Sequence, residues 1–583
     1  MIPVLARIAC ALLLIASLSA QQSPQPSPQQ AQSPQLPGAG KSGQPPPIAS
    51  PVPAAQGYRI AGTVVNSLTG QAVPSASVAI APITQGADRE ISRSVTAGAD
   101  GRFSFVGLSR GKYSLMAEAR GFSLQYFEHH DPFATAIAVG PDLDTHHLVF
   151  RLQSDASIEG DITDDNNEPI QNAMVRLFQT STEDGQQKTV PVNQAQTNDQ
   201  GHYRIGHLAP GTYYLAASAR PWYAQNANPA RMAKIPGADA RAAQDAAALD
   251  VTYPVTFYPG TSDAAGATPL QLTPGEKATA DVTLHAIPSL HLLIHTGLAE
   301  SAVHGRLLFP RISQRIFEGY LVSVSNASDS SVAPGVIEIA GLAPGHYIVE
   351  MPPSAGQNDK SGGRAWYREI DLVGDADISA ADGPGFATVG GSIFFQDVSR
   401  VPKHASVQLA NPETGETFRS DITDKGAFDL KSDEVRPGRY IIALENADGF
   451  FLQKLSATGA RIVGRTVEIA AGGSVHISGI ALRGAAQVDG TAMRENEPFA
   501  GAMIVLVPQD PANNSPLFRR DQTDSDGTFT LANVVPGQYT VIAIANGWDL
   551  EWANPAVLQP YLKQGEKIQV PTGGKIQVKV QVQ

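Results

Sequence analysis

Apolar and polar residues alternate along residues 523–541, which read TDSDGTFTLANVVPGQYTV. Phe529 and Leu531 alternate with polar residues before a Pro-Gly pair, and Tyr539 and Val541 alternate with them after it. A period of two is typical of a β-strand that buries one face. Asp-Gly and Pro-Gly supply backbone conformations that tight turns need. The pattern therefore predicts two strands, with a turn before the first and another between them.

The same pattern recurs along the chain with a nearly constant spacing. The turn glycine precedes a tyrosine by 12 residues in three copies and by 14 in a fourth. A reduced copy, VIEIAGLAPGHYIV, occupies residues 336–349. The four complete pairs are Gly101 and Tyr113, Gly201 and Tyr213, Gly426 and Tyr440, and Gly527 and Tyr539. Such spacing indicates a repeated supersecondary unit rather than a shared composition.

A second signature precedes each complete copy. It has a strand with Ile or Val and a Gly, a turn that ends in Pro, and a strand of small and branched residues. The turn prolines are Pro74, Pro169, Pro402 and Pro498. About seven strands in roughly 100 residues is the size of an immunoglobulin-like sandwich.

These repeats predict an all-β fold, a tandem array of about five Ig-like or prealbumin-like antiparallel β-sandwiches. Residues 57–583 then divide into five units of roughly 105 residues each. The second unit contains an insertion at 222–250, and the Ala-rich stretch from Ala238 to Leu249 is expected to form a short surface helix. The expected units are 57–154, 155–286, 287–384, 385–483 and 484–583.

The first 56 residues differ from the rest of the chain. Arg7 precedes an apolar run from Ile8 to Leu18, followed by small residues, which is the layout of a signal peptide over 1–20 with cleavage near Ala20. An uncleaved anchor is the alternative. Residues 21–56 are dominated by Pro, Gln, Ser and Gly, which predicts a disordered linker that either spaces the folded part from an attachment point or has no tethering role.

The repeated motifs resemble the carboxypeptidase regulatory-like domain family, which has a prealbumin-like or transthyretin-like sandwich. The matching elements are the G-x-[VI] strand, the P-x-x-[AG]-[AMS]-V segment, the T-D-x-x-G-x-[FY] turn and the L-x-P-G-x-Y strand. The match is good in units one, two and five, moderate in unit four and poor in unit three. The resemblance implies an accessory domain of multi-domain exported bacterial proteins. The sandwich of this family is similar to starch-binding-type modules. It implies no particular chemistry.

Composition and charge narrow the choice of partners. The formal net charge is −13 and the isoelectric point is about 5.5, which disfavours nucleic-acid binding. The single cysteine, Cys10, lies inside the expected signal peptide, so a cleaved chain would contain no thiol. No second apolar stretch is long enough for a transmembrane helix, so none is expected in the mature chain.

Motifs for catalysis and metal binding are absent from the sequence. His-Glu-x-x-His, His-x-x-Glu and a Walker-type loop do not occur, and no Gly-x-Ser-x-Gly lies on an expected strand–turn–helix. One group of residues carries metal-ligand chemistry, but adjacent histidines on a strand point to opposite faces, which favours ordinary surface loops. An EF-hand reading of the Asp-Ser-Asp-Gly turn fails because its twelfth position is Val535. No cofactor and no metal site are therefore expected. The residues with metal-ligand chemistry, which are expected to lie in ordinary surface loops, are Glu128, His129, His130, Asp131, Asp144, His146 and His147.

Aromatic residues at one end of the repeated units provide the best candidate for a binding site. Trp222 and Trp548 each lie nine residues after the tyrosine of their unit, which places them at the same strand end. Exposed aromatic rings with nearby carboxylates suit sugar stacking and hydrogen bonding. The alternative is that the rings plug the sandwich ends or pack between units. The candidate residues are Trp222, Tyr223, Trp548, Asp549, Glu551 and Trp552.

The sequence thus favours a non-enzymatic, exported binding or scaffold protein of the cell envelope, located in the periplasm, on the cell surface or outside the cell. Polysaccharides and envelope proteins are the candidate partners, and repeated weak modules would bind one polymer by avidity. One alternative is a structural or adhesive protein that binds other proteins through a sheet edge. Another is a hydrolase with an unrecognised site in the second or third unit.

Overall fold

The structure is a computed structural model that describes most of the chain after residue 56. The expected signal peptide and linker lie outside the described residues. Gly57–Gln583 forms one compact unit. The described residues are 57–583 except 84–91, 131, 183–184, 226–239, 297–309, 318–319, 325–327, 334, 352–364, 380–384, 397, 399, 431–434 and 448.

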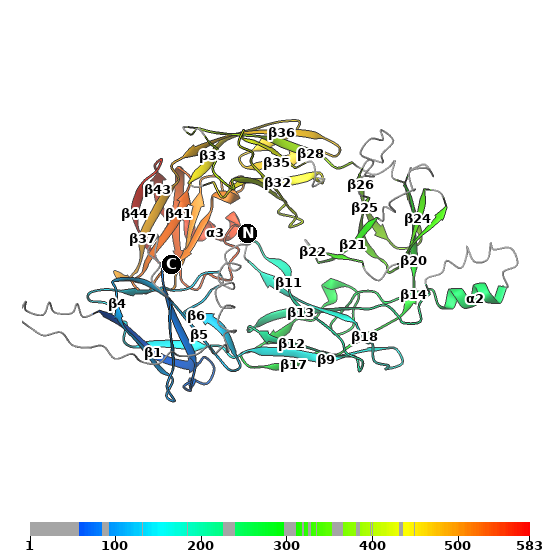
Figure 1. Ribbon diagram of the computed structural model, residues 1–583, viewed down its shortest axis with the longest axis horizontal. Coiled ribbons are helices and arrows are strands. Elements are labelled where there is room, and N and C mark those ends of the chain that lie inside the picture. The colour runs from blue at the N-terminus through cyan, green and yellow to red at the C-terminus, as the bar shows by residue number, and fades with distance from the viewer. Residues whose placement is uncertain are drawn as a thin grey trace, which may run out of the picture. The chain divides into compact units, whose positions relative to one another are not determined.

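Strand pairing sorts the described strands into five successive pairs of sheets, called sandwiches 1 to 5 (Figure 1). Each pair of sheets encloses its own cluster of buried apolar side chains. The predicted all-β class is confirmed. That each of the five expected ranges folds independently stays a prediction.

Sandwich 1 has one sheet in the order β4-β1-β8 and a second in the order β3-β2-β5-β6, with β7 also paired to β5. The predicted alternation is visible in β4, where Phe103 and Phe105 are buried and the residues between and after them are less so. The strands are β1 (Tyr58–Asn66), β2 (Ser77–Pro82), β3 (Arg93–Thr96), β4 (Arg102–Leu108), β5 (Gly111–Ala119), β6 (Phe122–Tyr126), β7 (Ile137–Val139) and β8 (Leu148–Leu152).

Sandwich 2 has sheets in the orders β12-β9-β17 and β11-β10-β13-β15, with β18 on β9 and β16 on β13. The helix expected in the insertion is present as α2 (Ala240–Ala248), and a short 3-10 helix, η3, spans Ala264–Gly266. The strands are β9 (Ala156–Asp164), β10 (Met174–Ser181), β11 (Lys188–Gln196), β12 (His202–Leu208), β13 (Gly211–Ser218), β15 (Thr256–Phe257), β16 (Leu270–Leu272), β17 (Lys277–Thr279) and β18 (Val282–Leu284).

Sandwich 3 has sheets in the orders β23-β24-β20-β27 and β22-β21-β25-β26. A two-stranded pair of β14 (Val251–Thr252) and β19 (Ile287–Pro288) lies directly before it in the chain. The strands are β20 (Leu290–His295), β21 (Arg311–Phe317), β22 (Tyr320–Ser323), β23 (Ser328–Ala333), β24 (Val336–Leu342), β25 (Gly345–Met351), β26 (Trp366–Leu372) and β27 (Ala376–Ser379).

Sandwich 4 has sheets in the orders β31-β28-β36-β33 and β30-β29-β32-β35-β34. The strands are β28 (Thr388–Phe395), β29 (Ser406–Ala410), β30 (Thr417–Asp421), β31 (Ala427–Asp429), β32 (Gly438–Glu445), β33 (Phe450–Thr458), β34 (Arg461–Val463), β35 (Thr466–Ile469) and β36 (Ser474–Arg483).

Sandwich 5 has sheets in the orders β38-β37-β41 and β40-β39-β42-β43, with β44 on β37. All six residues of β39 are buried, because its outward face packs against α3 (Pro555–Leu562) and the loop before that helix. A 3-10 helix, η7, spans Ser515–Leu517. The strands are β37 (Ala486–Arg494), β38 (Glu497–Pro498), β39 (Met503–Pro508), β40 (Arg519–Gln522), β41 (Thr528–Val534), β42 (Gly537–Ile544), β43 (Glu566–Val570) and β44 (Lys575–Gln581).

The sequence predicted antiparallel sandwiches. Most strand pairs are antiparallel, but each sandwich also contains a parallel pair. In each, the first long strand pairs in parallel with the last strand of the same sandwich. Turn chemistry predicts only the connections between neighbouring strands, so a pairing between the two ends of a unit leaves no local signal. The parallel pairs are β1 with β8, β9 with β17 and β18, β20 with β27, β28 with β36, and β37 with β44.

The tyrosine of the repeated pattern forms the same hydrogen bond in all five sandwiches. Its hydroxyl donates to the main-chain carbonyl oxygen four residues earlier, across a turn that contains Pro-Gly in four sandwiches and Arg-Gly in sandwich 1. The third sandwich, whose sequence signature is weakest, also has this bond. The pairs are Tyr113 with Ser109 (3.1 Å), Tyr213 with Ala209 (2.7 Å), Tyr347 with Ala343 (2.7 Å), Tyr440 with Arg436 (2.9 Å) and Tyr539 with Val535 (2.8 Å).

Candidate functional site

Trp222 and Tyr223 follow β13 in sandwich 2 and present an open aromatic surface. The side chain of Trp222 is 87% exposed. Its ring and that of Tyr223 meet edge to face, with centroids 5.7 Å apart. Burial raises the pKa of Tyr253, and the neighbouring Tyr223 adds to the rise. The pair therefore has one anchored phenol beside one free indole.

Trp548 lies in the loop after β42, and sandwich 1 covers its ring. The imidazole of His130 stacks on the indole with centroids 4.6 Å apart and planes 8° from parallel. Phe133 approaches the same indole with centroids 6.0 Å apart. The Trp548 Nε1 atom is buried and has no hydrogen-bond partner within the described residues. This arrangement corresponds to packing between units, the alternative that the sequence left open.

Trp552 lies in the same loop and contacts sandwich 2. Its Nε1 donates to the carbonyl oxygen of Thr182 at 3.0 Å. The guanidinium of Arg520 lies 4.3 Å from the centroid of the indole, within the range of a cation–π contact. These contacts hold Trp552 between a strand of its own sandwich and a loop that is about 370 residues away in the chain.

The two predicted carboxylates of this loop differ in their surroundings. Glu551 accepts a hydrogen bond from Asn554 at 2.8 Å and another from the amide of Gln187 at 3.2 Å. These two bonds lower the pKa of Glu551. Asp549 is exposed. The structure thus brings Trp548, Glu551 and Trp552 to one junction, whereas Trp222 and Tyr223 lie after β13 in sandwich 2.

Beside this junction, the turn that opens the sequence pattern docks on sandwich 1. Asp524 accepts a hydrogen bond from the amide of Ala136 at 3.0 Å and forms an ion pair with Lys112. The hydroxyl of Ser525 accepts a hydrogen bond from the amide of Ala138 at 2.8 Å, and the Ser525 amide donates to the carbonyl of Ala136 at 2.9 Å. The turn therefore pairs with the edge of β7, which begins at Ile137.

Gln522 extends the same interface and is nearly inaccessible, with 2% of its surface exposed. Its amide nitrogen donates to the carbonyl oxygen of Glu128 at 2.6 Å and to the hydroxyl of Thr135 at 2.8 Å. Its amide oxygen lies 3.2 Å from Nδ1 of His130. Sequence reasoning missed Gln522, since a glutamine at the end of a strand normally faces water and no motif marks it.

Burial changes the electrostatics of this interface. Desolvation raises the pKa of Asp521 to about 7, although the amides of Thr530 and Gln522 both donate to its carboxylate. Burial also raises the pKa of Asp524, and the neighbouring Lys112 opposes that rise. Two carboxylates and one ammonium group thus share a site from which water is largely excluded.

Comparison with known families identifies two of the sandwiches. The model of the carboxypeptidase regulatory-like domain matches residues 59–146 and 157–285. The chain carries two carboxypeptidase regulatory-like domains. They coincide with sandwiches 1 and 2, and this confirms the resemblance seen in the sequence for these two units. No curated protein matches the sequence.

Several solved structures share a weak likeness with the chain. The minor pilin GBS52 of Streptococcus agalactiae is 12% identical, with 40% of this chain and 97% of the pilin covered and a TM-score of 0.20. The Bacillus anthracis TIE protein is 11% identical, with 87% and 68% covered and a TM-score of 0.15. The shaft pilin SpaA of Lactobacillus rhamnosus GG is 8% identical, with 40% and 97% covered and a TM-score of 0.17. TM-scores this low give no basis for transferring a function.

The histidines of the first carboxypeptidase regulatory-like domain are spread over two places. His147 Nδ1 lies 3.0 Å from Asp144, and both side chains are exposed. His130 instead packs against Trp548, and burial lowers its pKa. Among the described residues, which leave out Asp131, no group of three or more potential ligands is placed to hold a metal ion.

A buried polar cluster joins the second carboxypeptidase regulatory-like domain to sandwich 3. His291 lies between two carboxylates, with Nε2 2.8 Å from Asp250 and Nδ1 2.9 Å from Glu338. Hydrogen bonds to these carboxylates, Asp250 foremost, outweigh the desolvation of the imidazole and raise the pKa of His291. Each of the three residues is less than 7% exposed. The cluster is a set of compensated buried charges.

Ser289 adds a hydroxyl to this cluster, so the cluster bears on the alternative that the chain is a hydrolase. The hydroxyl donates to the carboxylate of Asp250 rather than to His291. Ser289 is 7% exposed. In a Ser-His-Asp triad the serine hydroxyl donates to the imidazole and is open to the substrate, whereas the Ser289 hydroxyl donates to a carboxylate and is buried.

Within the part of the chain that the structure describes, no helical segment combines the length and the apolar character of a membrane span.

Proposed function

We propose that the chain is a non-enzymatic, exported scaffold protein of the cell envelope. In this proposal the sandwiches are locked to one another and hold a binding surface at a fixed position. The expected signal peptide and Pro-rich linker support export and attachment through a spacer, and the two carboxypeptidase regulatory-like domains support an accessory, non-catalytic function.

The observation that carries this proposal is the contact between sandwiches 1 and 5. Lys112, Ala136 and Ala138 bond with residues more than 380 positions later in the chain. Modules that move independently of one another do not require such contacts. A scaffold with fixed spacing does require them, because each linker alone would let neighbouring modules rotate.

The buried polar groups make this contact specific. Thr135, Gln522 and Thr523 are each at most 2% exposed and are all hydrogen-bonded. A buried polar group that loses its partner costs about 1–3 kcal/mol, so any displaced arrangement of the two sandwiches is disfavoured. The same argument applies to the Trp552 indole, which donates to Thr182 of sandwich 2.

Disulfide trapping tests the locked arrangement. The only native cysteine is Cys10, so a variant with Ala138→Cys and Ser525→Cys introduces the two relevant thiols into a chain that lacks others after residue 20. The Ala138 amide lies 2.8 Å from the Ser525 hydroxyl, so we expect rapid cross-linking under mild oxidation, read as a mobility shift on a non-reducing gel.

A matched control combines Ser525→Cys with Val149→Cys. Val149 is 47% exposed and lies on β8, in the other sheet of sandwich 1. The contact pair should cross-link much faster than this control pair. Equal rates would show that the sandwiches move freely and would refute the scaffold proposal. Amino-terminal sequencing of the secreted chain tests the export component, with cleavage expected near Ala20.

Carbohydrate binding by Trp222 and Tyr223 is a second candidate function, and the exposure of the Trp222 ring favours it. An indole open to solvent next to a phenol is a surface on which a sugar ring can stack. The chain has four tryptophans, and Trp222 is the exposed one, since Trp366 is 4% exposed and the other two are packed at the junction. Polysaccharide should therefore change the fluorescence of the chain, and Trp222→Ala should abolish that change. A change that persists in the variant would refute this site.

A further inference from the structure

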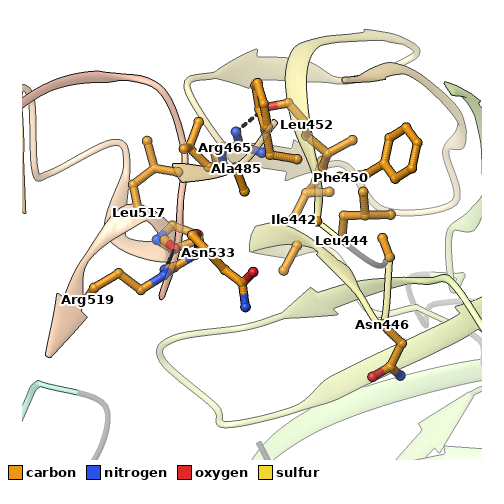
Figure 2. A pocket seen from close by; sticks show the side chains of 16 residues that line it. Ile442, Leu444, Asn446, Phe450, Leu452, Arg465, Ala485, Leu517, Arg519 and Asn533 are labelled. Atoms are coloured by element: carbon orange, nitrogen blue, oxygen red, sulfur yellow. Dashed lines mark hydrogen bonds between the residues drawn. The ribbon is translucent and has the colours of Figure 1, made fainter. Parts of the chain in front are cut away.

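A cavity of about 480 Å³ lies where sandwich 4 meets sandwich 5 (Figure 2). Residues of β32 and β33 line one side, and residues of η7, β40 and β41 line the other. Most of the lining side chains are apolar, among them Leu444, Phe450 and Leu517. Two arginines, Arg465 and Arg519, are the charged residues of the lining.

Arg519 is fixed in place by main-chain oxygens. Its Nη1 donates to the carbonyls of Pro516 at 2.8 Å and Phe518 at 2.7 Å, and its Nη2 donates to the carbonyl of Asn533 at 3.0 Å. Carbonyl groups satisfy hydrogen bonds but carry no formal charge. The guanidinium is therefore oriented without being neutralised.

Arg465 has more free donors. Its Nη2 donates to the carbonyl of Leu452, as drawn in Figure 2. Its Nε and Nη1 groups make no hydrogen bond to any described residue, and they are not sealed from solvent. An arginine presents its donors in a planar fork that matches the two oxygens of a carboxylate, so these free groups can bind an anion.

No carboxylate among the described residues forms an ion pair with Arg465 or Arg519. Burial lowers the pKa of both guanidinium groups, and that of Arg465 is lowered further by the nearby charge of Arg519. The chain as a whole has a net charge of −13. Two arginines without a carboxylate partner in such an acidic chain leave a local positive charge that is uncompensated.

We propose that this cavity binds a ligand that bears an oxyanion, with Arg465 and Arg519 as the groups that recognise the charge. The ligand's carboxylate or sulfate oxygens would accept from the free donors of Arg465. The amide of Asn446 lies on the same lining, and the apolar side chains suit the carbon face of a sugar ring. The cavity is large enough for a carboxylated sugar unit and also admits a free inorganic anion. This proposal does not depend on the scaffold function or on Trp222.

Isothermal titration of the full chain tests the proposal with three probes at constant ionic strength. Galacturonate and galactose form a matched pair, because they differ in a carboxylate in place of a hydroxymethyl group. Inorganic sulfate is the third probe. We expect galacturonate or sulfate to bind and galactose to bind at least about tenfold more weakly, since the cavity recognises charge. Tighter binding of galacturonate than sulfate would identify a sugar acid as the source of the anion, and the reverse would identify a free anion.

Arg465→Gln should weaken the binding of the preferred anion by about tenfold or more, because it removes the charge and the free fork. Arg461→Gln is the control, since Arg461 lies on the neighbouring β34 with its side chain 72% exposed. It should bind the anion as the unaltered chain does. Arg465→Lys, which keeps the charge, should retain part of the affinity and guards against a general folding defect in the glutamine variant. No anion binding by the unaltered chain, or equal binding by Arg465→Gln, would overturn the proposal.

Discussion

The carboxylate of Asp524 accepts a hydrogen bond from the main-chain amide of Ala136, a residue that lies 388 positions earlier in the chain, at 3.0 Å. Asp524 belongs to the turn that begins the strand pattern of sandwich 5, and its own amide donates to Thr528 within that turn at 2.8 Å. One residue thus shapes a local turn through its backbone and joins two distant sandwiches through its side chain.

Asp524→Ala should destabilise the contact between sandwiches 1 and 5. The substitution leaves the Ala136 amide without this acceptor and removes the ion pair of Lys112, which keeps its hydrogen bond to Thr528, and the loss costs about 1–3 kcal/mol. Chemical denaturation measures the loss, and hydrogen exchange should increase at residues 136–138. The control is Asp100→Ala, a turn aspartate of sandwich 1 whose side chain is 62% exposed, where we expect a change within about 0.5 kcal/mol. Unchanged exchange in the Asp524 variant would contradict the docking function of the turn.

Tyr347→Phe should lower the stability of sandwich 3 by about 1 kcal/mol. The hydroxyl donates to the Ala343 carbonyl at 2.7 Å, and burial of the phenol raises the pKa of Tyr347. Thermal unfolding of the variant measures the loss. Tyr126→Phe provides the comparison, because the Tyr126 hydroxyl makes no hydrogen bond to a described residue. If both variants unfold like the unaltered chain, the repeated tyrosine bond does not stabilise the fold.

His291 should make stability fall as the pH rises above neutrality. The carboxylates of Asp250 and Glu338 raise the pKa of His291 in the folded chain above the value of about 6.5 expected on unfolding. The stabilisation is therefore fully present below that value and is lost as the pH rises through the higher folded pKa. Denaturant titrations at several pH values measure this slope. His291→Gln should destabilise the chain by about 3–5 kcal/mol, since it removes the positive charge that lies between two buried carboxylates, and should remove the slope.

Asp521 should contribute a second pH dependence at lower pH. Burial raises its pKa from 3.8 to about 7, so the folded chain favours the protonated carboxyl. Its contribution is fully present below pH 3.8 and is lost as the pH rises to about 7, with a size on the order of 1 kcal/mol or more. Asp521→Asn should flatten the stability profile across this window. The same substitution at the exposed Asp549 should leave the profile unchanged, and a profile that is unchanged in both variants would refute the raised pKa.

The candidate binding residues show where sequence reasoning reached its limit. The spacing from each repeated tyrosine correctly placed Trp222 and Trp548 in loops after equivalent strands, β13 and β42. Spacing alone cannot distinguish the 87% exposed ring of Trp222 from the ring of Trp548, which stacks on His130. That difference depends on the loop of another sandwich. Gln522 and Arg519 were missed for the same reason, since their partners are distant in the sequence or are main-chain atoms.

By itself the sequence determined the alternating strands, the turns and the five-fold repeat, because these features depend on periodicity and turn chemistry within about 20 residues. Gly101, Gly201, Gly426 and Gly527 all have positive φ values, as their turns required. The tertiary structure alone decided the parallel pairing of each sandwich's ends, the docking of Asp524 on Ala136, and the meeting of Arg465 and Arg519 at the junction of sandwiches 4 and 5. Such contacts join residues that have no local relation, so only the packed arrangement of the whole chain brings them together.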